Sequence, residues 1–403
     1  MSGPPGDAQR SASGRRIAIV NWRDPWHPQA GGAERYAWEM ALGLHRRGAR
    51  VTYLTARAPG QASQEQHSGI GIVRLGGRLT VYPRVLAWMA RHRRSFDAVL
   101  DCQNGIPFFT PWVLPGNVPV LCVMHHVHDG QFGVYFPPLA ARIGRWLEGP
   151  VARWSYRRHE CVAVSASTAG AMRARLGWTG PIHIVPNGLP AQAPVRTAGT
   201  RTADPAPDGP DGAVTLSWVG RLVAHKRAER IIGVAERLAG RGVGIEVIGR
   251  GPAFGQLSDA VTARGLAGRV RLHGFVPEPE KQRLVADSVL HLNTSQGEGW
   301  GLCVLEAAAL GVPTVAYDVD GLRDAVRDGE TGWLVRDGDC LEDVTESALK
   351  ELADPARRAE LAAACRRWAG QFDWDRSAGM MAGLLSAALD RRQAAGRGTR
   401  GLS

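Results

Sequence analysis

The chain has 403 residues, of which 44% are hydrophobic, and this length favours two domains because single cores rarely grow beyond about 300 residues. The composition excludes a collagen, a wholly disordered chain and a disulfide scaffold. No uncharged apolar run reaches about 18 residues, so no membrane-spanning helix is predicted, and the polar first residues lack the apolar stretch of a secretory signal. The six cysteines are widely spaced without a C-x-x-C pair, which favours reduced thiols and a cytoplasmic location.

The charge is strongly basic, with a formal net value of +11 at pH 7. Nearly every cation is arginine, and the lysines are only Lys226, Lys281 and Lys350. A basic surface suits nucleic acid, anionic lipid or phosphorylated small molecules. A preference for GC-rich codons explains the choice of arginine over lysine, but it does not by itself explain the net charge.

Apolar runs and helical spacings alternate along the first half of the chain. A helix is predicted from Ala33 to Leu44, where apolar residues recur at helical spacing before Gly48. Strands are predicted at 16–21, 51–55, 97–102, 118–124, 160–164 and 182–185.

The alternation resumes after a segment at 191–212 that is rich in Ala, Pro, Gly and Asp and is predicted to be a flexible linker or loop. Strands are then predicted at 214–219, 243–248, 289–294 and 313–317, and helices at 226–239, 302–310, 342–352, 354–371 and 376–394. Two such series predict an α/β protein with two Rossmann-like, doubly wound parallel-sheet domains that face each other across a cleft. The predicted domains are 15–190 and 213–372, followed by a C-terminal helix at 373–394.

Ligands of such sheets bind beyond the carboxyl ends of the strands, and the first turn at that edge contains Gly31 and Gly32. Glycines let the backbone approach a ligand closely, and the following helix N-terminus favours an anion. A tight turn without a ligand explains the same two glycines equally well.

The second turn, Gly220 to Lys226, follows a predicted buried strand and contains Arg221. An arginine fork together with a lysine point charge suits a diphosphate. For an isolated arginine and lysine, a solvated basic loop would be the ordinary interpretation.

The third turn gives the strongest signal, because Glu298 stands between glycines just before a predicted helix and Glu306 follows two turns later. Backbone amides at such a helix N-terminus bind anions, and carboxylates accept hydrogen bonds from vicinal sugar hydroxyls. The structural alternatives are that Glu298 complements the helix dipole and that Glu306 lies on a solvated face of the helix. Neither alternative explains the glycines on both sides of Glu298.

A histidine cluster, His125, His126 and His128 with Asp129, follows another predicted strand, and His125 is expected to project into the cleft. Consecutive strand residues point to opposite faces, so the spacing argues against a metal site and favours a single histidine as a substrate contact. Asp318-Val319-Asp320 has the D-x-D form of some metal-dependent sugar-nucleotide enzymes, but a turn into Gly321 is the preferred interpretation. Gly249-Arg250-Gly251 lacks the G-x-G-x-x-G spacing of a dinucleotide fingerprint.

These residues together resemble the retaining GT-B glycosyltransferases of family 4, over roughly residues 16–336. Glu298 and Glu306 match the family's E-x7-E pattern, and the match continues through Gly329-Glu330-Thr331-Gly332. The remaining motifs match in the expected order: Gly31-Gly32-Ala33-Glu34, Pro186-Asn187-Gly188, and Gly220-Arg221-Leu222 with Lys226.

The resemblance implies a hexosyltransferase or related glycosyltransferase that uses a nucleoside-diphosphate-sugar and needs neither a metal nor another cofactor. It assigns Arg221 and Lys226 to the diphosphate, Glu306 to the ribose and Glu298 to the transferred sugar. His125, or His126 if the register is shifted by one, would lie near the reacting sugar. The resemblance also implies a front-face mechanism and a C-terminal helix that crosses back to the first domain. Further donor contacts would come from Gly31, Gly32, Gly249, Gly251, Val276, Gly299, Trp300, Gly301, Leu302 and Cys303.

The acceptor is expected to bind the first domain, and the candidate contacts are Asn21, His128 and Asp129, with Arg23, Asp24, Gln131 and Phe132 as further candidates. The acceptor is expected to be a lipid-linked or cell-envelope glycan, or a soluble secondary metabolite. The alternative function is a non-catalytic protein that binds nucleotide-sugars or nucleic acid, although the chain carries no motif for specific nucleic-acid binding.

Two basic segments, 81–94 and 142–158, contain tryptophans and suit peripheral contact with the inner face of the cell membrane. The preferred interpretation is that Trp88, Trp146 and Trp154 pack into the core, because apolar helical stripes usually face a core.

Overall fold

The computed structural model describes residues 12–190 and 214–398, and side chains as far as residue 394. The described residues divide into two compact units. Unit 1 comprises residues 12–190 and 373–398, and unit 2 comprises residues 214–372. The linker predicted at 191–212 lies outside the described residues.

Unit 1 is built on an eight-stranded sheet in the order β3-β4-β2-β1-β5-β6-β7-β8, in which β3 is antiparallel to β4 and all other pairs are parallel. From β1 the chain adds strands first on one side of the sheet and then, from β5 onward, on the other, so the strand order reverses between β1 and β5. The strands are β1 (Arg16–Val20), β2 (Arg50–Thr55), β3 (Gln64–His67), β4 (Ile70–Arg74), β5 (Ala98–Gln103), β6 (Val120–Met124), β7 (Glu160–Ala163) and β8 (Ile182–Ile184). The β3–β4 hairpin was not predicted, because the largely exposed sequence QEQH of β3 carries no apolar pattern.

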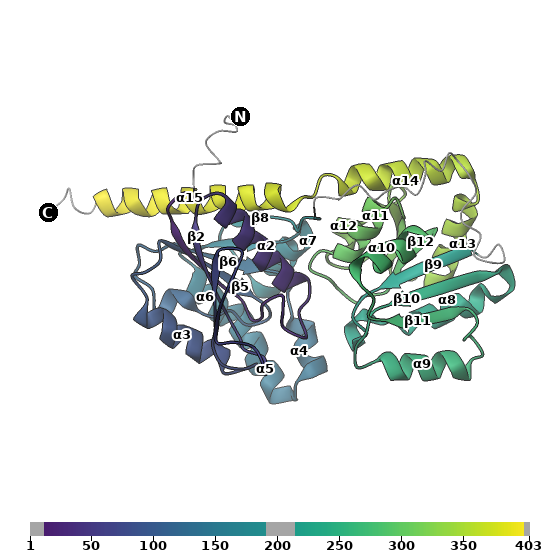
Figure 1. Ribbon diagram of the computed structural model, residues 1–403, viewed down its shortest axis with the longest axis horizontal. Coiled ribbons are helices and arrows are strands. Elements are labelled where there is room, and N and C mark those ends of the chain that lie inside the picture. Colours follow the sequence, from purple (N-terminus) through teal and green to yellow (C-terminus); the bar gives the residue numbers. More distant parts are fainter. Residues whose placement is uncertain (1–11, 191–213, 399–403) are drawn as a thin grey trace. The chain divides into compact units, whose positions relative to one another are not determined.

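The helices of unit 1 include one from the C-terminal end of the chain, α15, which packs against α2 (Figure 1). Arg47 donates two hydrogen bonds to the Asp375 carboxylate, both at 2.9 Å. A Cβ at Gly43 would collide with the side chain of Ala378, so glycine permits this close approach. The helices are α2 (Gly32–Arg46), α3 (Val81–Arg91), a 3-10 turn η1 (Thr110–Trp112), α4 (Asp129–Tyr135), α5 (Pro138–Trp146), a π-helical turn η2 (Leu147–Val151), α6 (Ala152–Tyr156), α7 (Ala166–Leu176) and α15 (Trp374–Gly398).

The turn at Gly188 explains why the Pro-Asn-Gly motif ends in glycine. A Cβ at Gly188 would collide with the backbone nitrogen of Trp374 at the start of α15. The backbone at Leu189 also pairs with Asp373 in a single β-bridge. The motif therefore seats the C-terminal helix on unit 1.

The tryptophans of the two basic segments do not behave alike. Trp88 is half-buried and packs against the core of unit 1, as predicted. Trp146 and Trp154 are each 58% exposed, so the prediction that they pack into the core is wrong. The inner side of their helices is occupied by other residues, among them Ala141, Ala152 and Tyr156, and both indoles lie on the outer side.

Unit 2 is built on a six-stranded parallel sheet in the order β11-β10-β9-β12-β13-β14, and its strand order reverses between β9 and β12. Its strands are β9 (Val214–Val219), β10 (Val243–Ile248), β11 (Val270–Gly274), β12 (Leu290–Asn293), β13 (Thr314–Tyr317) and β14 (Gly332–Val335). Its helices are η3 (Ala224–Lys226), α8 (Arg230–Arg237), η4 (Ala239–Arg241), α9 (Phe254–Ala263), α10 (Glu278–Ala286), α11 (Leu302–Ala309), α12 (Leu322–Ala325), α13 (Leu341–Leu352) and α14 (Pro355–Ala369).

The helix predicted at 226–239 starts later than expected, at Arg230. Arg227 adopts a left-handed conformation with φ of 47°, which interrupts the helical path directly after Lys226. Each unit encloses its own apolar core between sheet and helices, so the predicted α/β class with two doubly wound parallel-sheet domains is confirmed. No helix in the described part of the chain is both long and apolar enough to cross a membrane.

Candidate active site

The loops that follow β9 and β12 meet at the point where the sheet of unit 2 reverses. Thr294 joins them, because its hydroxyl accepts from the Trp218 indole at 2.9 Å and donates to the Lys226 carbonyl at 2.7 Å. The backbone amide of Gln296 donates to the backbone carbonyl of His225 at 2.8 Å. These bonds fix Lys226 opposite Glu298, a pairing that was not predicted from the sequence.

Lys226 and Glu298 form an ion pair, and their side chains are only 17% and 16% exposed. Burial opposes the charge on Lys226, but the neighbouring Glu298 carboxylate raises the lysine pKa above its ordinary value. Burial likewise opposes the charge on Glu298, but Lys226 and a 2.7 Å hydrogen bond from Ser295 lower the pKa of Glu298. Both groups are therefore charged at neutral pH, and each holds the other in place.

Two arginines border this pair. Arg221 is exposed on the same loop. Arg227 donates to the Thr294 carbonyl at 3.0 Å, and its guanidinium lies 4.3 Å from the centre of the Tyr317 ring. Arg227 was not predicted as a site residue, and its adjacency to Lys226 was the only sequence signal for it.

A second lysine–carboxylate pair lies on α10 and α11. The Lys281 ammonium is 2.9 Å from a carboxylate oxygen of Glu306 and 3.0 Å from one of Glu278. Lys281 and Glu306 are 17% and 22% exposed, whereas Glu278 is 55% exposed. Lys281 was missed by the sequence analysis, although it is one of only three lysines in the chain.

Two glycines among the predicted donor contacts, Gly249 and Gly251, are required by loop packing. Gly249 has φ of 142°, and a Cβ there would collide with the Gly220 carbonyl. A Cβ at Gly251 would collide with the Leu222 carbonyl. The loop after β10 therefore presses against the loop that carries Arg221.

The glycine-rich loop before α11 has a related constraint. Gly301 caps the helix in a left-handed conformation, with φ of 84°. Gly321 also has a positive φ, and a Cβ there would collide with the Glu298 carbonyl. The backbone amide of Glu298 donates to the Asp320 carbonyl at 2.9 Å. The segment 318–321 is thus a turn that supports the Glu298 loop, as predicted.

The other predicted donor residues of unit 2 differ in exposure. Trp300 is buried, with its ring edge-on to Phe372 at 5.1 Å between centres. Cys303 is half-buried and receives a 3.2 Å hydrogen bond from Asn293, and burial raises its pKa to about 11. Half-buried side chains are also found at Val276 and Leu302, and Gly299 is half-buried as well.

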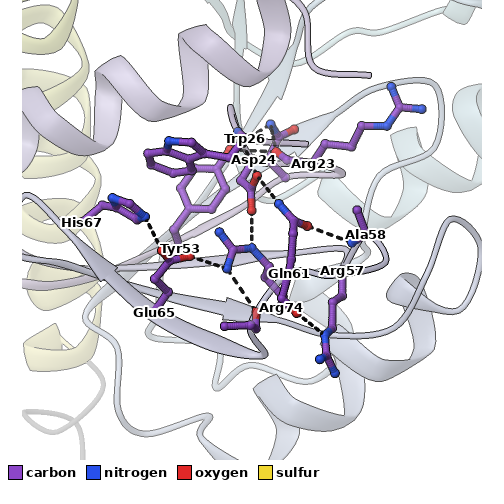
Figure 2. Close-up of polar contacts among 12 residues, drawn as sticks. Arg23, Asp24, Trp26, Tyr53, Arg57, Ala58, Gln61, Glu65, His67 and Arg74 are labelled. Carbon is purple, nitrogen blue, oxygen red and sulfur yellow. Dashed lines mark hydrogen bonds and ion pairs between the residues drawn. The ribbon is translucent and has the colours of Figure 1, made fainter. Parts of the chain in front are cut away.

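The corresponding edge of unit 1 carries a polar cluster built around Asp24 (Figure 2). Asp24 accepts a 2.5 Å hydrogen bond from Arg74, and the two side chains are 0% and 1% exposed. Arg74 also contacts Glu65 at 2.7 Å, and Gln61 donates to Asp24 at 3.2 Å. Asp24, suggested as an acceptor contact, therefore anchors the loop after β1 to β4.

Asn21 lies in the same loop and is fully buried. Its amide nitrogen donates to Tyr53 at 3.0 Å and to the Arg23 carbonyl at 3.1 Å, and its oxygen accepts from Asn104 at 3.1 Å. These bonds shape the loop, and acceptor binding by Asn21 stays a prediction.

Gly31 and Gly32 begin helix α2. The Gly31 amide donates to the Glu34 carboxylate at 2.8 Å in a capping arrangement. Gly31 has φ of −148°, and a Cβ there would meet only Glu34 at 3.6 Å. The fold itself does not require glycine at position 31.

His125 is 6% exposed, and its Nε2 has no hydrogen-bond partner among the described residues. Burial, together with the nearby His128, lowers its pKa to about 3, so the ring is neutral at pH 7. Its ring lies edge-on to Tyr36, with centres 5.0 Å apart. His126 is half-buried, with its ring edge-on to that of His128.

The remaining acceptor candidates are held within unit 1. The His128 amide donates to Glu148 at 2.7 Å, and Asp129 forms an ion pair with Arg175. Gln131 is half-buried and Phe132 is buried. Within residues 12–190 and 214–398, no three His, Cys, Asp or Glu side chains are grouped so as to hold a metal ion.

The class of protein follows from comparison with known families. The family model for glycosyl transferases group 1 matches residues 202–368, and that for glycosyltransferase family 4 matches residues 30–193. The chain belongs to the group 1 glycosyltransferases of family 4. Sucrose-phosphate synthase from Thermosynechococcus elongatus has a similar structure, with a TM-score of 0.76 and 20% identity over 95% of this chain and 100% of that one. The fold is accordingly GT-B.

Individual relatives have different activities. The chain is 31% identical over 267 residues to a 2-deoxystreptamine glucosyltransferase of Streptomyces kanamyceticus, covering 63% of this chain and 67% of that protein. It is 28% identical over 305 residues to a GDP-mannose-dependent α-(1-6)-phosphatidylinositol monomannoside mannosyltransferase of Mycolicibacterium smegmatis, covering 67% and 79%. It spans 42% to 45% of the length of five D-inositol 3-phosphate glycosyltransferases that it matches.

Proposed function

We propose that this protein transfers a sugar from a nucleoside-diphosphate-sugar to an acceptor hydroxyl, with retention of configuration and without a metal ion. The observation that carries the proposal is the Lys226–Glu298 pair at the reversal point of unit 2. An ammonium and a carboxylate held together there match the two ends of the scissile bond, which are a diphosphate and a polyhydroxylated sugar.

In the proposed reaction the diphosphate draws the Lys226 ammonium away from Glu298. Lys226 and Arg221 then balance the negative charge that grows on the leaving phosphate oxygen, an interaction that strengthens in the transition state. The first backbone amides of α11 add partial positive charge to the same region. Freed from Lys226, the Glu298 carboxylate accepts hydrogen bonds from hydroxyls of the transferred sugar.

The bond between the anomeric carbon and the phosphate oxygen breaks, and its electron pair stays with the nucleoside diphosphate. The acceptor oxygen attacks the same face of the sugar, and its proton passes to the departing phosphate oxygen. We assign His125 the role of a neutral hydrogen-bonding group toward substrate, because its unpartnered Nε2 and low pKa exclude a stable imidazolium at neutral pH. Glu306 is assigned to the ribose, which it binds while Lys281 holds its other oxygen.

Two acceptor classes remain candidates, a lipid-linked or cell-envelope glycan and a soluble secondary metabolite. The phosphatidylinositol mannoside and 2-deoxystreptamine named for the two relatives support one class each. A cytoplasmic location is part of the proposal and is supported by six free thiols, four of them buried.

The donor is found by thermal melting with UDP, GDP, dTDP and ADP, since a ligand at about 100 times its Kd adds about 2.7 kcal/mol of stability. Turnover of the matching sugar is then measured with EDTA, and NMR gives the anomeric configuration of the product. We expect a retained configuration and an unchanged rate in EDTA. An inverted product, or activity that EDTA removes and Mg²⁺ restores, would contradict the proposal.

A substitution tests the role of the ion pair itself. Lys226→Gln should lower kcat by about 100- to 1,000-fold, the usual cost of removing a group that stabilises developing charge. Lys350→Gln is the matched control, because this lysine is 65% exposed and pairs with Glu346 on its own helix, α13. Equal rates for the two variants would remove Lys226 from the reaction.

A further inference from the structure

The surface of unit 1 carries a helical segment that exposes several large apolar side chains. Segments α5, η2 and α6 form one continuous helical run from residue 138 to 156. The inner side buries Tyr156 together with several small residues, and Leu147 and Val151 pack partly against the core. Further large apolar residues are exposed on the outer side, where surface helices ordinarily carry polar ones. The buried small residues are Ala141, Gly144, Gly149, Ala152 and Ser155.

The outer side carries four other large apolar residues. Leu139 is 71% exposed, Ile143 48%, and Trp146 and Trp154 58% each. The first three are spaced by four and three residues, so they line one side of the helix. Trp154 follows Trp146 by eight residues, one more than two α-helical turns. The intervening π-helical turn, closed by i→i+5 bonds, accommodates the additional residue and keeps Trp154 on the same side.

The charge of this segment is entirely positive at the surface. Five arginines between residues 137 and 158 are all exposed, and they are Arg142, Arg145, Arg153, Arg157 and Arg158. The one acidic residue of the segment, Glu148, is fully buried. Arg157 stacks on the Trp154 ring with its guanidinium 4.7 Å from the ring centre, so the cation and the indole are held together at the surface.

The apolar line continues into a groove at the far end of the helix. Trp112, 52% exposed, donates from its indole to Ser155 at 2.9 Å and faces the groove that Trp154 also lines. Arg392 of α15 borders the same groove and is fixed by hydrogen bonds to the carbonyls of Gly116 and Arg158 at 2.9 and 2.8 Å. The groove thus combines two indoles with three guanidinium groups.

We propose that this face docks on an anionic lipid surface. The helical run is about 28 Å long at 1.5 Å per residue, with the amphipathic pattern of a helix that lies in the plane of a membrane interface. Indoles prefer the headgroup level, aliphatic side chains enter the acyl boundary, and arginines bind lipid phosphates. The inference goes beyond the proposed reaction and does not depend on it.

Other occupants fit less well. A nucleic acid would be held by the arginines, but Leu139 and Ile143 offer bases neither stacking nor hydrogen bonds. A second copy of the chain, related by twofold symmetry, would bring two uncompensated arginine clusters together. A lipid surface accommodates both the apolar line and the positive charge.

The test is sedimentation of the full chain with vesicles of phosphatidylcholine, with and without phosphatidylglycerol, at 0.15 M salt and with no sugar donor present. We expect binding only with phosphatidylglycerol. Trp146→Ser/Trp154→Ser should reduce binding at least tenfold, and Arg142→Gln/Arg145→Gln by about 25-fold, near fivefold per arginine. Arg237→Gln/Arg283→Gln, which removes two exposed arginines of unit 2, is the control and should bind as the wild type does.

Three results would overturn the proposal: no binding to anionic vesicles, equal loss in the control, or full binding by both surface variants. Size-exclusion chromatography adds a further outcome, because a dimer that the tryptophan variant dissociates would assign the face to a second copy. Competition of vesicle binding by random RNA at the same salt would assign it to nucleic acid. Failure of the proposed function leaves all of these readouts unchanged, since none involves turnover.

Discussion

Each unit carries an ion pair at the carboxyl edge of its sheet, and the two pairs differ in their exposure to solvent. In unit 1, Asp24 and Arg74 are at most 1% exposed, and other hydrogen bonds surround the pair. In unit 2, Lys226 and Glu298 are about one-sixth exposed. A fully enclosed pair fixes a loop, whereas a pair open to solvent can exchange one partner for a ligand. Exposure, rather than the presence of charge, separates the structural pair from the pair that we propose binds the donor.

The largest expected effect is on the stability of unit 1. Asp24→Ala leaves Arg74 buried without its main partner and should cost about 3 kcal/mol, the low end of the range for breaking a buried pair, because Glu65 remains. Asp287→Ala removes an exposed carboxylate that pairs with Arg283 in unit 2 and should cost under about 1 kcal/mol. Urea unfolding measures both variants, and similar losses would contradict the contrast between enclosed and open pairs.

Acid should reveal a property that the units share. His125 in unit 1 and His291 in unit 2 are buried, and burial lowers the pKa of each to about 3. Below pH 6.5 the unfolded imidazole gains a proton that the folded one does not, so acid favours unfolding. Each histidine should remove about 1.4 kcal/mol of stability per pH unit between about pH 6 and 4.

Melting temperatures of wild type and His291→Phe across this pH range isolate one of the two contributions. The variant should lose stability less steeply with acid than the wild type. Parallel pH profiles for the two proteins would show that His291 does not couple folding of unit 2 to protons.

The smallest expected effect sharpens the assignment of the second lysine pair. Glu306→Gln should raise the Kd for the nucleoside diphosphate about tenfold, the equivalent of one charge-assisted hydrogen bond. Glu278→Gln is the control, because Glu278 contacts the same Lys281 but is 55% exposed. Calorimetric titration of both variants decides, and equal affinities would leave Glu306 without a role at the ribose.

The sequence predicted the two sheets well, because buried parallel strands such as β1 and β9 are continuous apolar runs. It missed the two edge strands of unit 2, β11 and β14. It also missed the β3–β4 hairpin, which supplies Arg74 and Glu65, since β3 is polar and its pairing is set by tertiary contacts. Arg74 could not be recognised as a buried partner, because arginine is ordinarily exposed and nothing in its neighbours shows an acid 50 residues away.

At the candidate site, Glu298, Glu306 and Lys226 were predicted from glycine spacing and motif order, but neither the pairing of Lys226 with Glu298 nor the Lys281 partner of Glu306 was. Lys281 lies 25 residues before Glu306, and only the packing of α10 near α11 brings them together. Trp146 and Trp154 were assigned to the core by helical spacing alone. Spacing shows that residues share a face, but not whether that face is turned inward.

The central claim is that Lys226 exchanges Glu298 for the donor diphosphate. Calorimetric titration of the nucleoside diphosphate into Lys226→Gln and Glu298→Gln tests it most directly. We predict that Lys226→Gln weakens binding about 10- to 100-fold, as expected for hydrogen bonds to a charged group. Glu298→Gln should bind the nucleotide at least as tightly as the wild type, because the competing carboxylate is gone. Wild-type affinity in Lys226→Gln, or a comparable loss in Glu298→Gln, would contradict the exchange.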